Sequence, residues 1–264
     1  MQDVIINSPS LNPSKNVSGI SAVVKFIIDQ NKSCHYIHFE IGRKDKDNGG
    51  MGRFLAIFHS LRRWRALLKA NPNAIVHFNS ALTKVCLVRD SLYLYFCRNN
   101  KLVIHLHGGN YLFENNHPFY IKWLLKRLFK KSSTFVALSN KEKKIIEEKY
   151  RVKTVVSLPN CIDLEDAAQY DKLYHTDHPT LGYIGRIAST KGMNELLDAC
   201  VKLKQDNIAF KLIIAGSERE GDCFIHSYKE QLGDSFEYWG VVSGTEKKEF
   251  FKRQIQARKL GIIS

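Results

Sequence analysis

Short apolar runs rich in β-branched residues alternate along this chain with longer stretches of helical periodicity, and this alternation limits the fold more than any other feature. The first run is Val4–Ile6, and a helical pattern opens at Gly19. Parallel strands need crossovers of about a dozen residues or more, which helices supply, so the alternation predicts an α/β fold with a parallel sheet. In the first half we expect strands at residues 4–6, 35–39, 74–78, 102–106, 134–138 and 155–158, and helices at residues 19–29, 54–69, 119–131 and 142–150.

The alternation is interrupted once and then starts again. Between Asp163 and Pro179 the apolar periodicity weakens, and charged residues mix with His and Tyr. Such a stretch is typical of a linker between domains. Beyond it we expect strands at residues 180–184, 211–215 and 236–239, and helices at residues 193–204, 224–232 and from 245 onward. We therefore predict two α/β domains, residues 1–170 and 171–264.

Composition narrows the class of protein and the kind of partner. Hydrophobic residues make up 44% and charged residues 25% of the chain, as in ordinary globular proteins. The 40 Lys and Arg residues outnumber the 26 Asp and Glu residues, which gives a formal net charge of +14. This excess favours anionic partners: nucleic acid, acidic lipid headgroups or phosphorylated small molecules. Charge alone does not choose among the three.

The six cysteines are scattered, and none belongs to a Cys-x-x-Cys pair. This spacing argues against a zinc site and against a secreted disulfide framework, so we expect reduced thiols. The N-terminus leads into an apolar run without a basic segment, and no uncharged apolar stretch approaches the roughly 20 residues that span a bilayer. We expect neither a signal peptide nor a transmembrane helix, and a location in the cytoplasm or at the inner face of the plasma membrane.

The segment Gly182–Gly192 carries the clearest chemical pattern. An apolar strand ends at Gly185, and two cations five positions apart, Arg186 and Lys191, come just before a helix. The unpaired N–H groups and the dipole of a helix N-terminus, together with Arg and Lys, form a ready diphosphate site. The alternative is a plain strand-to-helix turn with two solvated cations, and spacing alone does not separate the two.

This segment resembles the donor-binding loop of the family 4 glycosyltransferases, retaining enzymes of the GT-B fold with two Rossmann-like domains. In that family an Arg and a Lys of the loop grip the diphosphate of a nucleotide sugar. Further segments resemble family motifs in the same order, from about residue 17 to residue 250. They are Val17–Ser21, Ile104–Gly109, Val136–Ser139, Leu158–Asp163, Leu212–Gly216 and Tyr238–Val242. The family usually has Gly where this chain has Cys161. Each match is weak alone, because a strand followed by glycine is common, and the shared order makes the set specific.

The resemblance implies transfer of a sugar from a nucleoside diphosphate sugar to a hydroxyl group, with retained anomeric configuration and with neither metal nor cofactor. Arg186 and Lys191 would stabilise the leaving diphosphate. The backbone around the donor would come from Gly19, Gly185, Gly216 and Val242. The acceptor would be a glycan or a lipid-linked oligosaccharide in the synthesis of a bacterial surface polysaccharide.

His107 follows a predicted strand and precedes Gly108 and Gly109. This places it at the carboxyl edge of the sheet, where α/β proteins bind ligands. From the pattern alone, a histidine satisfied within a turn is the stronger interpretation. The family resemblance favours instead a sugar-facing residue that positions or polarises the sugar rather than acting as a base. His105, on the same face of the strand, fits the core and the support of the site equally.

Two segments, Arg62–Arg65 and Lys122–Lys131, interleave cations with aromatic and apolar residues. A helix that lies on an anionic membrane has this composition, which suits a peripheral enzyme acting on a lipid-linked acceptor. An ordinary surface helix with solvated lysines and a buried apolar stripe fits equally. We do not expect nucleic-acid binding, because no nucleic-acid motif accompanies the charge.

Family 4 enzymes carry two glutamates eight positions apart in the second domain, and this sequence has no Glu pair at that spacing. After Phe250 and Phe251 the chain continues as a basic tail, residues 252–264, where the family has a strand. We therefore expect a frameshift or premature stop near codon 252 and an incomplete second domain. Two alternatives to an active transferase stay open: a truncated, catalytically inactive remnant that binds acceptor or membrane, and a GT-B nucleotide-sugar 2-epimerase.

Overall fold

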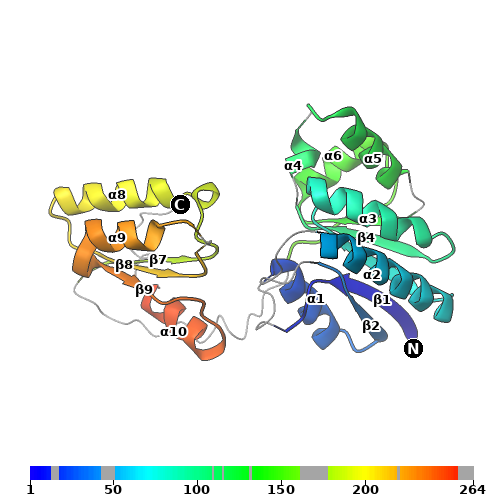
Figure 1. Cartoon of the computed structure of the whole chain (residues 1–264), viewed down its shortest axis with the longest axis horizontal. Helices are drawn as coiled ribbons and strands as arrows, with labels where there is room; N and C mark the ends of the chain where they lie inside the picture. Colours follow the sequence, from blue (N-terminus) through cyan, green and yellow to red (C-terminus); the bar gives the residue numbers. More distant parts are fainter. Residues whose placement is uncertain are drawn as a thin grey trace. The chain divides into compact units, whose positions relative to one another are not determined.

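The computed structural model describes residues 1–12, 18–42, 51–108, 110–114, 116–130, 133–160, 178–218 and 221–254, and for residues 51–55, 110 and 254 the backbone alone. The chain forms two compact units, Met1–Ile162 and Asp163–Ser264 (Figure 1). The predicted domain boundary between residues 170 and 171 lies outside the described residues. So do Val17, Gly109, Cys161 and residues 255–264 of the basic tail.

A six-stranded parallel sheet in the order β2-β1-β3-β4-β5-β6 forms the first unit. Its strands are β1 (Gln2–Ser8), β2 (Cys34–Glu40), β3 (Ile75–Ser80), β4 (Leu102–Leu106), β5 (Thr134–Ala137) and β6 (Val155–Ser157). The central strands bury apolar residues on both faces, as a parallel sheet covered by helices does. In the register Ile6 is opposite His77, and Asn79 is opposite His105. The carboxyl ends of β1, β3 and β4 therefore lie next to one another.

The helices of the first unit connect successive strands. They are α1 (Gly19–Gln30), α2 (Met51–Ala70), α3 (Lys84–Phe96), α4 (Asn110–Phe113), α5 (Phe119–Phe129) and α6 (Asn140–Tyr150). Crossovers between parallel strands are right-handed, so the direction of a crossover decides which face of the sheet its helix covers. Helix α1 connects β1 to β2 in one direction and covers one face. The later helices lead in the opposite direction and cover the other face. The larger core lies under α2, α3, α5 and α6, around Phe78 and Ile104. Trp64 of α2 belongs to this core, completely buried, with its indole N–H donating to the backbone O of Tyr93 at 3.1 Å. It is therefore not a surface aromatic of the basic segment Arg62–Arg65.

The second unit has a three-stranded parallel sheet, β7-β8-β9, among its described residues. Its elements are β7 (Thr180–Ile184), the 3-10 helix η1 (Ser189–Lys191), α8 (Met193–Gln205), β8 (Lys211–Ala215), α9 (Phe224–Leu232), the 3-10 helix η2 (Gly233–Ser235), β9 (Phe236–Tyr238) and α10 (Gly244–Gln254). Helices α8 and α9 cover one face around Ile214, and Phe250 of α10 packs against Ile213 and Ala215 on the other. Both units are thus helix–sheet–helix layers with parallel strands, which confirms the predicted fold class.

Most predicted elements are present, with ends displaced by one to three residues, and β4, β7, β8 and α9 have the predicted bounds. Ser139 caps α6, since its Oγ accepts a hydrogen bond from the N–H of Glu142 at 3.2 Å. Helices α3 and α4 were not predicted. Helix α3 is apolar on its inner and its outer side, with Leu87 buried and Val88 exposed, so its sequence lacks the contrast between faces that marks a helix.

Candidate functional site

The sheet of the first unit has a topological switch point at β1. This strand lies between β2 and β3, so the crossovers on its two sides cover opposite faces of the sheet. Open α/β sheets bind ligands outside the carboxyl ends of their strands at such a point. Asn7 and Ser8 end β1, Asn79 and Ser80 end β3, and all four are buried. Buried polar groups need hydrogen-bond partners, and these partners build the site.

Asn7 and Asn79 join β1 to β3 through three hydrogen bonds. The Nδ2 of Asn7 donates to the backbone O of Asn79 at 3.1 Å, and the backbone N–H of Asn79 donates to Oδ1 of Asn7 at 2.8 Å. The Nδ2 of Asn79 donates to the backbone O of Asn7 at 2.8 Å. A carbonyl oxygen can only accept, so this last contact fixes which end of the Asn79 amide is nitrogen and leaves Oδ1 for another partner.

That partner is His107, which directly follows β4. Its backbone N–H continues the ladder by donating to the backbone O of Ser80 at 2.8 Å. Its Nε2 lies 2.7 Å from Oδ1 of Asn79. Because an amide oxygen only accepts, Nε2 of His107 carries the proton and Nδ1 keeps its lone pair. At its second ring nitrogen, His107 is therefore a hydrogen-bond acceptor.

His77, His105 and His107 form what we call the histidine stack across β3 and β4. Ring centroids are 5.5 Å apart between His77 and His105 and 4.2 Å apart between His105 and His107. Burial lowers the pKa of His77 and of His105 to about 4, and burial together with the other two rings lowers the pKa of His107 to about 3. All three are neutral at pH 7. The stack is no metal centre, because within the described residues no group of three or more His, Cys, Asp and Glu can hold an ion.

The support beneath His107 continues in His105. This residue is 2% exposed, and its Nδ1 is 3.3 Å from Nε2 of His77. Its own Nε2 is buried without a hydrogen-bond partner in the described part of the chain. His105 is therefore a core residue whose ring lies against His107, so its position fits both the core and the support of the candidate site.

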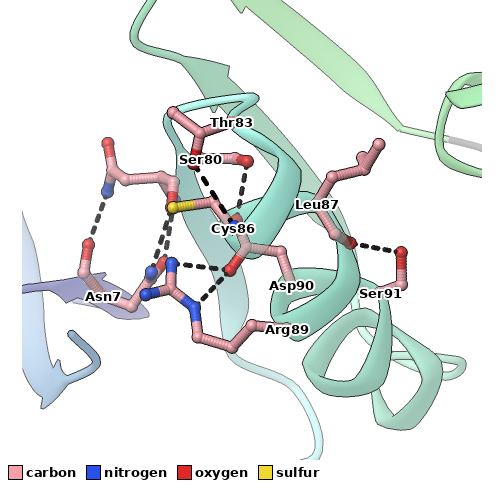
Figure 2. Close-up of polar contacts among 9 residues, drawn as sticks. Asn7, Ser80, Thr83, Cys86, Leu87, Arg89, Asp90 and Ser91 are labelled. Atoms are coloured by element: carbon pink, nitrogen blue, oxygen red, sulfur yellow. Dashed lines mark hydrogen bonds and ion pairs between the residues drawn. The ribbon is translucent and has the colours of Figure 1, made fainter. Parts of the chain in front are cut away.

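A second polar network anchors the end of β3 to α3, and Figure 2 shows it. The Oγ of Ser80 donates to Oδ2 of Asp90 at 2.7 Å, while Nη2 and Nε of Arg89 reach Oδ1 of Asp90 at 2.7 and 2.8 Å. Burial raises the pKa of the Asp90 carboxyl, and the neighbouring Arg89 and Ser80 oppose that rise. The network holds Ser80, whose backbone O in turn receives the N–H of His107.

The loop that leaves β1 leads to the N-terminus of α1, on the same edge of the sheet. Ser18, at the N-cap, makes no side-chain capping hydrogen bond, and Oγ of Ser21 is buried without a partner among the described residues. A Cβ built on Gly19 would meet nothing within 4 Å. Unpaired N–H groups of a first helical turn attract anions, and the Ser21 hydroxyl is a further donor beside them.

In the second unit Arg186 and Lys191 lie between β7 and α8. Both side chains are exposed, and neither has a hydrogen bond or ion pair within the part of the chain that the structure describes. Gly192, with a φ of +77°, ends η1 and begins α8, and Glu195 is the acidic residue of the first turn. Two unpaired cations beside a helix N-terminus can bind a diphosphate, and Glu195 weakens the positive potential there.

Gly185 and Gly216 directly follow the adjacent strands β7 and β8 and touch each other. A Cβ on Gly216 would lie 1.7 Å from the backbone O of Gly185, and the φ of Gly216 is +148°, which favours glycine. Gly216 thus lets the loop of Arg186 pass close over β8. Val242 follows β9, and its side chain packs, partly buried, against the cluster around Phe250.

Models of two glycosyltransferase families match the chain in succession. The model described as Glycosyltransferase Family 4 matches residues 34–166, half of the chain, and the model described as Glycosyl transferases group 1 matches residues 167–257. The chain belongs to glycosyltransferase family 4. The resemblance seen in its ordered motifs is thereby confirmed.

Solved structures show the GT-B fold of this family 4 glycosyltransferase. A glycosyltransferase from Rickettsia africae ESF-5 has a TM-score of 0.56 at 18% identity, over 92% of this chain and 69% of that one. The catalytic domain of starch synthase IV from Arabidopsis thaliana, bound to ADP and acarbose, has a TM-score of 0.58 at 10% identity, over 95% and 76%. A putative UDP-N-acetylglucosamine 2-epimerase from Listeria monocytogenes has a TM-score of 0.58 at 12% identity, over 95% and 71%. No curated protein sequence matches the chain.

The structure divides the predicted site residues of this glycosyltransferase into two sets. Those of the first unit are Gly19 and His107, and those of the second unit are Gly185, Arg186, Lys191, Gly216 and Val242. Sequence reasoning missed four polar residues of the first unit: Asn7, Asn79, Ser80 and Asp90. A signal for three of them was present, because polar residues directly end two apolar strand runs.

Proposed function

We propose that this family 4 glycosyltransferase moves a sugar from a nucleoside diphosphate sugar to a hydroxyl acceptor with retention of configuration, in the synthesis of a bacterial capsule, O-antigen or exopolysaccharide. The observation that carries the proposal is His107, a neutral imidazole with its Nδ1 lone pair available at the switch point of the sheet. The family match and the ADP bound to the similar starch synthase IV support it. We place the reaction in the cytoplasm, at the inner face of the plasma membrane.

In this proposal His107 positions the sugar and does not act as a general base. A pKa of about 3 makes its ring a weak base at neutral pH. Its Nδ1 accepts a hydrogen bond from a sugar hydroxyl, while Asn79 holds the ring at Nε2. Fixed orientation of a reacting group is itself a large part of enzymatic rate enhancement.

Arg186 and Lys191 bind the donor diphosphate and stabilise the charge that develops as it leaves, and the α1 N-terminus at Gly19 and Ser21 offers further donors for phosphate. Preorganised charges of this kind contribute several kcal/mol to a transition state. The bond between the anomeric carbon and the diphosphate oxygen breaks, and the bond between that carbon and the acceptor oxygen forms. The acceptor proton passes to the leaving diphosphate, so no side chain needs to act as the base.

Calorimetry with UDP, GDP and ADP tests the donor site. We expect the chain to bind one of the three, and Arg186→Gln or Lys191→Gln to weaken that binding about tenfold, because each removes a charge-assisted hydrogen bond. Lys202→Gln, an exposed lysine at the other end of α8, removes the same charge and should keep the wild-type affinity. Failure of the wild type to bind any of the three, or equal affinity in all variants, contradicts the proposal.

The second candidate function is a nucleotide-sugar 2-epimerase, favoured by the likeness to the Listeria structure. Incubation of the preferred nucleotide sugar with and without an acceptor separates the two activities. A transferase releases nucleoside diphosphate only when acceptor hydroxyls are present. An epimerase inverts C2 without acceptor, and a chain that binds the donor but does neither is the inactive remnant.

A further inference from the structure

Helices α2, α3 and α5 carry an unusual concentration of positive charge. They lie side by side over the larger core of the first unit (Figure 1). Their only carboxylate is Asp90, which is buried in its ion pair with Arg89. Among their described side chains, the exposed cations are Arg62, Arg63, Arg65, Lys69, Lys84, Lys122, Lys126 and Arg127. Helix α6 of the same unit is different, because its Lys143 and Lys144 pair with glutamates. On this side of the unit, α2, α3 and α5 thus carry positive charge that carboxylates of the same helices do not balance, unlike α6.

The same side exposes apolar residues in a row. Along α3 these are Val85, Val88, Leu92 and Tyr95, each at least 45% exposed. Their spacing of three and four positions puts them on one stripe of the helix, about 15 Å long at a rise of 1.5 Å per residue. Phe119 and Trp123 of α5 are exposed as well, at 84% and 50%. Single exposed apolar residues are ordinary, but an aligned row marks an interaction surface.

A pocket of about 220 Å³ lies between the C-terminal halves of α3 and α5. Its apolar lining includes Leu94 and Leu128, and its cations are Arg98, Arg127 and Lys130. The Cζ of Arg98 is 4.0 Å from the centre of the Tyr95 ring, which lines the same pocket. Guanidinium and ammonium groups bind phosphate oxygens. With three cations around it, the pocket therefore suits a phosphate group.

We propose that the outer surface of α2, α3 and α5, which we call the basic face, docks on an anionic phospholipid bilayer and takes a lipid phosphate into this pocket. Within the described residues no helix is long and apolar enough to cross a bilayer. Burial of the α3 stripe and attraction of the cations to anionic headgroups act together. A second copy of this chain is disfavoured as the partner, because two basic faces repel each other. Nucleic acid is also disfavoured, because it would leave Val85, Val88 and Leu92 without an apolar contact. Binding of the basic face to a bilayer does not require the proposed sugar transfer, so either proposal can fail without the other.

Co-sedimentation with vesicles tests whether the cations of the basic face contribute to membrane binding. The chain should bind phosphatidylcholine vesicles that contain phosphatidylglycerol, should not bind pure phosphatidylcholine, and should dissociate at raised salt. Replacing all three pocket cations, Arg98→Gln, Arg127→Gln and Lys130→Gln, should weaken binding about a hundredfold, at about fivefold per cation. The matched control removes the same charge from α6 through Lys141→Gln, Lys143→Gln and Lys144→Gln. It should keep binding within about twofold, because those lysines lie off the basic face.

A second pair of substitutions tests the apolar stripe. Val88→Ser with Leu92→Ser keeps every charge and alters only exposed positions, and it should weaken vesicle binding about tenfold. Trp123 emission should shift to the blue on vesicle binding, and the shift should be absent in Trp123→Phe. Equal loss in the α6 control, unchanged binding of the Val88 and Leu92 variant, or tighter binding to RNA than to vesicles at the same salt each overturn the proposal. Circular dichroism checks that every variant is folded.

Discussion

The histidine stack makes the first unit sensitive to acid. The pKa values of His77 and His105 are lowered to about 4 and that of His107 to about 3, against an ordinary value near 6.5 in an unfolded chain. At pH values between the lowered pKa of each histidine and about 6.5, the unfolded chain binds more protons than the folded one. The contribution of the three neutral histidines to the free energy of unfolding is therefore fully present above about pH 6.5. It is lost progressively as the pH drops below that value.

The size of the effect follows from the lowered pKa values. At pH 5 an unfolded histidine is almost fully protonated, whereas His107 is still neutral in the fold. The free energy of unfolding therefore falls by about 2 kcal/mol for each histidine of the stack between pH 7 and pH 5. His107→Gln cannot titrate, so its stability should fall by about 2 kcal/mol less over the same interval.

Urea unfolding of the whole chain at pH 7 and pH 5, followed by circular dichroism, measures this difference. The loss of the Asn79 hydrogen bond lowers the stability of His107→Gln at both pH values, and only the difference between them reports titration. His59→Gln, at an exposed position of α2, is the control substitution of a histidine outside the stack. The reasoning is refuted when His107→Gln loses as much stability between pH 7 and pH 5 as the wild type.

Three further substitutions test other contacts by urea unfolding. Asn79→Ala removes two buried hydrogen bonds and leaves Nε2–H of His107 unpaired, so it should cost about 2–5 kcal/mol and lower the transfer rate. Asp90→Ala leaves Arg89 without its buried partner, at a cost of about 3 kcal/mol. Gly216→Ala forces a Cβ into neighbouring backbone at an unfavourable φ and should cost the second unit about 3 kcal/mol. A decrease in the free energy of unfolding below about 0.5 kcal/mol is typical of an ordinary surface position. For any of the three variants, so small a decrease would contradict the role given to that contact.

The strands could be predicted closely because their signal is local. The bounds of β4 are those expected from the apolar run Leu102–Leu106, which polar residues end on both sides. Helix α3 was missed because its outer stripe is as apolar as its inner one. The basic face therefore follows from the structure: two of its helices were recognised as basic, while Val88 and Leu92 between them were not.

The position of the candidate site could be predicted from the sequence, but the hydrogen bonds between its residues could not. A histidine before two glycines at the end of a strand predicts a residue at the carboxyl edge, where His107 lies. Its partner Asn79 comes 28 positions earlier and reaches it through the pairing of β3 with β4. Pairing and register depend on packing across the whole sheet, so no local pattern shows which nitrogen of His107 carries the proton. The roles assigned to Arg186 and Lys191 stay predictions.

The anomeric configuration of the transferred sugar tests most directly the central claim, that this chain is a retaining nucleotide-sugar transferase. The measurement is proton NMR of the product formed from an α-linked nucleoside diphosphate sugar and a hydroxyl acceptor. The account predicts an α-linked product, with a rate that falls about a hundredfold when Arg186→Gln and Lys191→Gln are combined. A β-linked product, or a nucleotide sugar inverted at C2 without any transfer, would contradict it.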